Sequence, residues 1–193
     1  MNKIRTSTHY FKKICNTKKQ SLLSDFIDEY RNVTQLVVDY LWDNEIVYQN
    51  KIFNIKKDLL DCPPFISTTD INIDTNLSDR AIKCAATQAC SIIRGTVEKK
   101  KKRLYVLDKL KQEGKDPSKL QEKIDKTPIN KPTIPNDFKC ELNSICCDFL
   151  ETDNSFDGFI QLKSIGKKYG KIKIPVKFHR QSNKWKKKGI LMT

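Results

Sequence analysis

Apolar residues recur at three- and four-residue steps over two long stretches of the chain, the spacing of a buried helix face. The first stretch runs from near Ser21 to about Tyr48, with apolar positions at Leu22, Phe26, Tyr30, Val33, Val37 and Leu41. The second follows Asn76 and Ser78, whose side-chain oxygens suit an N-cap, and lasts until Gly114. Its apolar positions are Ile82, Ala85, Ala86, Ala89, Ile92, Ile93, Val97, Leu104, Leu107 and Leu110. These patterns predict two long helices.

Shorter segments separate and follow the two helices. Residues 54–75 are interrupted by prolines and small polar residues, which favours a loop. Pro117 suits the first position of a short helix over 118–125, and three prolines in 127–137 indicate a stiff connector.

After residue 137 the period changes from that of a helix to that of a strand. Residues 171–178 alternate strictly, with lysines outward and Ile, Val and Phe inward, which predicts a half-buried strand. Another apolar run, 159–162, precedes it beyond a turn signal at 153–155. The chain is therefore expected to be α+β, with helices first and a small antiparallel sheet last.

The charge of the chain is concentrated at its two ends. The formal net charge is +14, from 37 Lys and Arg against 23 Asp and Glu. Residues 1–20 carry six of these cations and residues 158–193 carry eleven, and neither segment contains an acidic residue. The middle is slightly acidic. Positive charge confined in this way indicates a polyanionic partner, above all a nucleic acid.

Several other classes of protein find no support in the sequence. No apolar run approaches the roughly 20 residues of a membrane span, and no signal peptide is evident, so a cytoplasmic protein without membrane contact is expected. Seven cysteines without a C-x-x-C pair, beside only two histidines, argue against a structural metal site. Nucleotide-binding and nucleophile motifs are missing as well. We expect no cofactor and no metal.

Three basic clusters are the candidate nucleic-acid contacts. Lys171, Lys173 and Lys177 share one face of the predicted strand, where they could track a phosphate backbone or simply keep a sheet face soluble. Arg94 and the run 99–103 on the second helix could grip a duplex or form a solvated helix end. Trp185 lies among lysines, and Trp185 or Tyr169 could stack on unpaired bases. The alternative for Trp185 is packing in the core. The full set is Arg94, Lys99, Lys100, Lys101, Lys102, Arg103, Tyr169, Lys171, Lys173, Lys177, Arg180, Lys184, Trp185, Lys186, Lys187 and Lys188.

One group of carboxylates lies near the basic segment. Two-metal nucleases need carboxylates that converge on ions a few ångströms apart. Asp148, Glu151, Asp153 and Asp157 are spread over a predicted turn, so a polar turn is the favoured interpretation and no catalytic residue is expected.

The order of these parts resembles one protein family. Residues 77–83, the small residues of 85–89, Ile92-Ile93-Arg94-Gly95 and the lysine run are similar to a recognition-lobe helix of transposon-encoded TnpB-like nucleases and type V CRISPR effectors. Residues 156–162 and 170–177 resemble the wedge domain of that family. The RuvC-like nuclease domain of the family has no counterpart in these 193 residues.

The resemblance implies an architecture and a function. The helical part, 21–136, would be inserted into a basic wedge-like antiparallel β-barrel formed by 1–20 and 137–193. Such a chain would bind guide or other structured RNA, and an RNA–DNA duplex, by its backbone and without cutting it. Any nuclease would be a separate subunit. The alternative is a protein-interaction module, such as an inhibitor or accessory subunit of a nucleoprotein complex.

Overall fold

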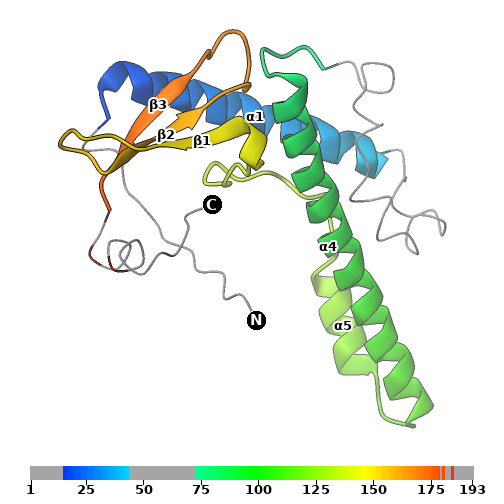
Figure 1. Cartoon of the computed structure of the whole chain (residues 1–193). Coiled ribbons are helices and arrows are strands. Elements are labelled where there is room, and N and C mark those ends of the chain that lie inside the picture. Colours follow the sequence, from blue (N-terminus) through cyan, green and yellow to red (C-terminus); the bar gives the residue numbers. More distant parts are fainter. Residues whose placement is uncertain (1–14, 44–72, 179, 181–183, 185–193) are drawn as a thin grey trace. The chain divides into compact units, whose positions relative to one another are not determined.

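Helices and a small sheet make up the computed structural model, which describes residues 15–43, 73–178, 180 and 184 (Figure 1). The chain divides into two compact units. The sheet unit comprises Met1–Tyr30, Thr75–Ala81 and Cys140–Thr193, and the helical unit comprises Arg31–Asp74 and Ile82–Lys139. Both long helices continue from one unit into the other. The predicted domain limits at 20/21 and 136/137 stay predictions.

Helix α1 (Thr17–Asp43) carries the first predicted apolar face. Phe26, Tyr30, Val33, Val37 and Leu41 are all buried, which confirms this face. The helix begins four residues earlier than Ser21 because the Asn16 side chain accepts a hydrogen bond from the Lys19 amide at 2.9 Å. The predicted end near Tyr48 lies outside the described residues.

Helix α4 (Asp79–Gln112) confirms the second predicted helix, and it runs without interruption through the lysine run. Within the helical unit, its residues Ala86, Ala89 and Ile93 pack against Val37 and Leu41 of α1. Small side chains at two of these positions let the helix backbones approach closely. This cluster is the core of the unit.

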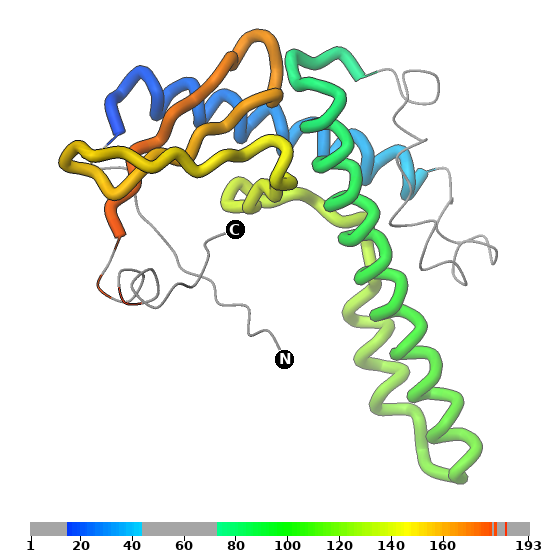
Figure 2. The backbone as a smooth tube through the Cα atoms, in the orientation of Figure 1, coloured from blue at the N-terminus to red at the C-terminus, as the bar shows by residue number. Residues whose placement is uncertain are grey.

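Helix α5 (Ser118–Lys126) follows a turn at Gly114 and lies beside the distal half of α4 (Figure 2). Pro117 is the N-cap rather than the first helical residue, and the Asp116 side chain accepts a hydrogen bond from the Ser118 amide at 2.9 Å. The connector 127–137 forms no helix or strand. It is attached to α1 by Gln35, whose side-chain oxygen accepts from the Ile134 amide at 2.7 Å.

The sheet has three antiparallel strands in the order β1–β2–β3, which confirms the α+β class. A short 3-10 turn (Ser144–Cys146) leads into β1 (Cys147–Leu150), followed by β2 (Gly158–Leu162) and β3 (Ile172–Val176). Among the described residues this sheet is open, so the expectation of a closed barrel is not supported. Three strands of four or five residues are too few and too short to close a barrel. Of the N-terminal segment 1–20 expected to complete it, residues 1–14 lie outside the described residues and residues 17–20 belong to α1.

Candidate nucleic-acid interface

The outer face of the sheet carries a row of lysines. Ile172, Ile174 and Val176 are buried, whereas Lys171, Lys173 and Lys177 are exposed, so the predicted alternation of this strand is confirmed. The strand register sets Lys173 opposite Gln161 of β2, and Gln161 opposite Asp148 of β1. Opposed residues share a face, so these side chains belong to one polar surface, on which Lys173 is exposed and Gln161 is buried.

Lys163 adds a fourth cation to this polar surface, just beyond the end of β2. Its ammonium lies 2.7 Å from the Asp148 carboxylate, and both side chains are about one-third exposed. Asp148 therefore compensates Lys163. The structure shows no ion pair for the lysines of β3 within the part of the chain it describes. Their charge is available to a partner.

The basic loop, residues 163–171, joins β2 to β3 with an unusual backbone. Ser164, Gly166 and Gly170 all have positive φ, of 53°, 153° and 59°. A Cβ at Gly166 would lie 2.1 Å from the carbonyl oxygen of Asn76, so only glycine fits there. The Ser78 amide donates to the Ile165 carbonyl at 3.0 Å, and Ile165 is fully buried. These contacts fix the loop on the segment before α4 and leave Lys167 and Lys168 exposed at its tip.

A hydrogen-bond network around the half-buried Glu29 carboxylate anchors the other end of the basic loop. The Tyr169 hydroxyl donates to Glu29 of α1. The same carboxylate accepts from the Thr75 hydroxyl at 2.7 Å and from the Asn76 amide at 2.5 Å. Burial favours protonation of Glu29, but the hydrogen bonds outweigh it and lower the pKa from 4.5 to about 2. Glu29 is thus an anionic hub that joins α1, the segment before α4 and the basic loop.

Tyr169 is not available for base stacking. Its side chain is 3% exposed, and its ring meets Phe26 edge-on with a centroid separation of 5.4 Å. Burial and the hydrogen bond to Glu29 also raise the pKa of its hydroxyl. The prediction of a stacking role for Tyr169 is therefore wrong. Tyr169 packs in the core of the sheet unit instead.

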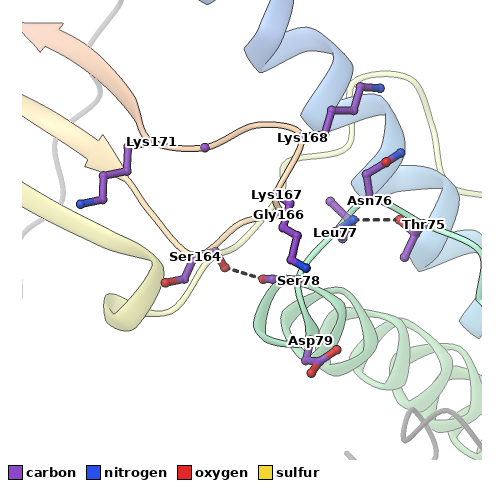
Figure 3. Close-up of a pocket in the computed structure, with 11 residues that line it drawn as sticks. Thr75, Asn76, Leu77, Ser78, Asp79, Ser164, Gly166, Lys167, Lys168 and Lys171 are labelled. Atoms are coloured by element: carbon purple, nitrogen blue, oxygen red, sulfur yellow. Dashed lines mark hydrogen bonds between the residues drawn. The ribbon is translucent and has the colours of Figure 1, made fainter.

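An open pocket of about 700 Å³ lies between the basic loop and the start of α4, within the sheet unit. In Figure 3, Lys167 reaches toward Ser78, whereas Lys168 and Lys171 point away on opposite sides. The Ser78 hydroxyl is already engaged, because it donates to the Ser164 carbonyl and accepts from the Ala81 amide. Lys167 is therefore the lysine of this pocket that is directed into it (Figure 3), and Asp79 is the one acidic residue in its lining.

The remaining predicted contacts of the C-terminal segment are described only in part. Arg180 and Lys184 are exposed. Trp185, Lys186, Lys187 and Lys188 lie outside the described residues, so their assigned roles stay predictions.

The second basic cluster belongs to the helical unit. Arg94, Lys99, Lys100, Lys101 and Lys102 are exposed on α4, which confirms that the lysine run cannot be buried. Arg103 is half-buried, and its guanidinium donates to the Thr127 carbonyl at 2.5 Å. Arg103 therefore ties α4 to the end of α5.

The carboxylates of 148–157 do not converge. Asp148 pairs with Lys163, and Asp157 accepts from the Phe178 amide at 2.8 Å. Across the described ranges, no three His, Cys, Asp or Glu side chains form a group able to hold a metal ion. Burial and the neighbouring Asp148 raise the pKa of Cys147, only partly offset by Lys163, so that side chain stays a thiol at neutral pH.

Comparison with protein-family models, curated proteins and solved structures finds no match for this chain. In the part of the chain that the structure describes, none of the helices is long and apolar enough to cross a membrane.

Sequence reasoning missed the basic loop as a unit, including Lys163, Lys167 and Lys168. A signal was present in Gly166-Lys167-Lys168-Tyr169-Gly170-Lys171, where two glycines bracket a lysine pair. Nothing in the sequence marked Glu29 as the partner of the tyrosine, since 140 positions separate them.

Proposed function

We propose that the chain binds nucleic acid through its phosphate backbone, using the basic surface of the sheet unit. This surface consists of Lys173 of β3, Lys177 just after the strand, and Lys167, Lys168 and Lys171 of the basic loop. The observation that supports the proposal is a lysine row on the polar sheet face beside a lysine-bearing loop that buried contacts hold in place. The lysine ammonium attracts phosphate as a compact positive charge. A loop whose backbone is already fixed loses little conformational entropy when it binds.

The expected partner is RNA in a structured or guide form, or an RNA–DNA duplex. Phosphate contacts position a protein on its ligand without reading the sequence of bases. Lys171, Lys173 and Lys177 would neutralise successive phosphates along the exposed strand, together with Lys167 and Lys168 from the loop. The similarity to TnpB-like nucleases gives the same expectation, with any nuclease provided by a separate subunit and no cleavage by this chain.

The experiment compares two double variants of the full chain for binding to an RNA hairpin and an RNA–DNA duplex. Lys171→Ala with Lys173→Ala removes two outward charges from the sheet unit. Lys119→Ala with Lys123→Ala removes two exposed charges from α5 and serves as the matched control. Loss of two phosphate contacts is expected to weaken binding by about 10-fold for the first variant, and the control is expected to change little.

Two results would overturn the proposal. Equal losses in both variants would mean that net charge alone, and not the sheet surface, attracts the nucleic acid. Capture of one partner protein that survives nuclease treatment, with no excess absorbance from nucleic acid, would favour the protein-interaction alternative.

A further inference from the structure

Tyr105 of α4 stands out among the aromatic residues that the structure describes. It is 67% exposed, and the other described aromatic side chains are buried or half-buried. No hydrogen bond or ring contact involves it within the described ranges. A single exposed ring is common on protein surfaces, so the groups around it decide whether it marks a binding site.

The surroundings of Tyr105 are cationic and hollowed. Lys101 and Lys102 precede it by four and three residues, so they share its helix face. Gly95 lies further along this side of the helix, where a Cβ would meet nothing within 4 Å. Together with Glu98 and Lys99 these residues line an open concavity of about 610 Å³.

The charges of this concavity favour a polyanion. Glu98 lies 4.0 Å from Lys101, which offsets its carboxylate. Lys99 and Lys102 have no ion pair among the described residues, and both are exposed. An aromatic ring among cations is the combination that binds unpaired bases, with the ring stacking on a base and the cations meeting the adjoining phosphates.

We infer that Tyr105 is a stacking platform for an unpaired base of a single-stranded nucleic acid, with Lys99 and Lys102 on its phosphates. The inference shares the partner class of the proposed function but uses the helical unit and requires an unpaired base. A paired duplex keeps its bases stacked on one another and offers no free ring face to Tyr105. Binding at Tyr105 therefore distinguishes single-stranded from double-stranded nucleic acid. Phosphate contacts in the sheet unit do not make this distinction.

The test measures binding of the full chain to a fluorescent oligouridylate and to a blunt RNA duplex of the same length. Tyr105→Ala is expected to weaken oligouridylate binding by about 10-fold while duplex binding stays nearly unchanged. Tyr105→Phe keeps the ring and is expected to retain wild-type binding. Leu104→Ala is the matched control, since Leu104 is 51% exposed on the adjacent position of the same helix turn. All three variants should keep the thermal midpoint of the unmodified chain.

Photocrosslinking with 5-iodouridine gives a direct second readout, and the crosslinked peptide is expected to contain Tyr105. Equal binding of the Tyr105→Ala and unmodified chains, or an equal loss with Leu104→Ala, would overturn the inference. If the chain binds the duplex but Tyr105 has no effect, only this inference fails. If the unmodified chain binds neither probe, the proposed function fails with it.

Discussion

The two basic surfaces of this chain carry similar charge on very different supports. The lysines of the basic loop sit on a backbone that Gly166, buried Ile165 and the Glu29 network hold in one shape. Those of α4 extend from a helix whose distal half is mostly exposed and has α5 along one side (Figure 2). Lysines on a backbone that is already fixed lose only side-chain entropy when they bind, whereas lysines on a more solvated segment also lose the entropy of ordering that segment. Equal charge therefore does not mean equal affinity.

The largest expected effect comes from destroying the rigid support of the basic loop. Gly166→Ala would place a Cβ 2.1 Å from the Asn76 carbonyl oxygen, at a φ of 153°. We expect a loss of about 3 kcal/mol in the free energy of unfolding, from steric conflict and backbone strain together. Urea unfolding measures the loss. Gly170→Ala is the control, because its Cβ would meet nothing within 4 Å and only the cost of a φ of 59° remains.

Removing the charge of Glu29 should come next in size. Glu29→Gln keeps the shape but weakens the charge-assisted hydrogen bonds from Tyr169, Thr75 and Asn76, at an expected cost of about 2 kcal/mol at neutral pH. The pKa of Glu29 is lowered on folding, so its contribution to stability is complete above about 4.5 and is lost as the pH falls toward about 2. Thermal midpoints of both chains across this window should converge at low pH. Parallel curves at every pH would show that the Glu29 charge does not hold the loop.

The comparison of the two surfaces can be made directly with matched charge deletions. Lys167→Ala with Lys168→Ala removes the tip of the basic loop, and Lys99→Ala with Lys102→Ala removes two lysines of α4. For a structured RNA we expect about a 10-fold loss of affinity for the loop pair and about a 3-fold loss for the helix pair, since the loop is held in advance. Fluorescence anisotropy at one fixed salt concentration measures both. The reverse order would contradict the advantage assigned to the rigid loop.

The smallest effect concerns the helix itself. Gly95 lies in the interior of α4, and a Cβ there meets no other atom within 4 Å. Gly95→Ala should therefore raise the free energy of unfolding by about 0.5–1 kcal/mol through helix propensity alone. A destabilised variant would mean that this face of the helix is packed against something that the described residues do not include.

Elements governed by local periodicity were predictable, and those governed by distant contacts were not. The whole of α4 followed from its apolar spacing, its cap and Gly114, and the alternation of β3 followed from the lysine pattern. Each of these signals lies within one element. The start of α1 was missed because one side chain, Asn16, decides it.

The candidate site was only half predictable for the same reason. Charge told us which segments were basic, but the shape of the basic loop depends on Gly166 meeting Asn76, far away in the sequence. Tyr169 was assigned to stacking because lysines surround it in the sequence, yet its direction is set by Glu29 on α1. Tyr105 was overlooked because the lysine run beside it predicts only that this part of the helix is exposed to solvent. It does not predict a binding role for the exposed ring. The closed barrel came from the family resemblance and not from the residues themselves.

The central claim, that phosphates bind to the lysines of the sheet unit, is tested most directly by a salt titration. The measurement is the affinity of the full chain for an RNA hairpin at increasing concentrations of monovalent salt. If four to six phosphates are neutralised, the logarithm of the association constant should fall linearly with the logarithm of the salt concentration, with a slope of about −3 to −5. Lys171→Ala with Lys173→Ala should reduce that slope in magnitude by about 2. An affinity that barely changes with salt, or a slope that the double variant leaves intact, would contradict the account.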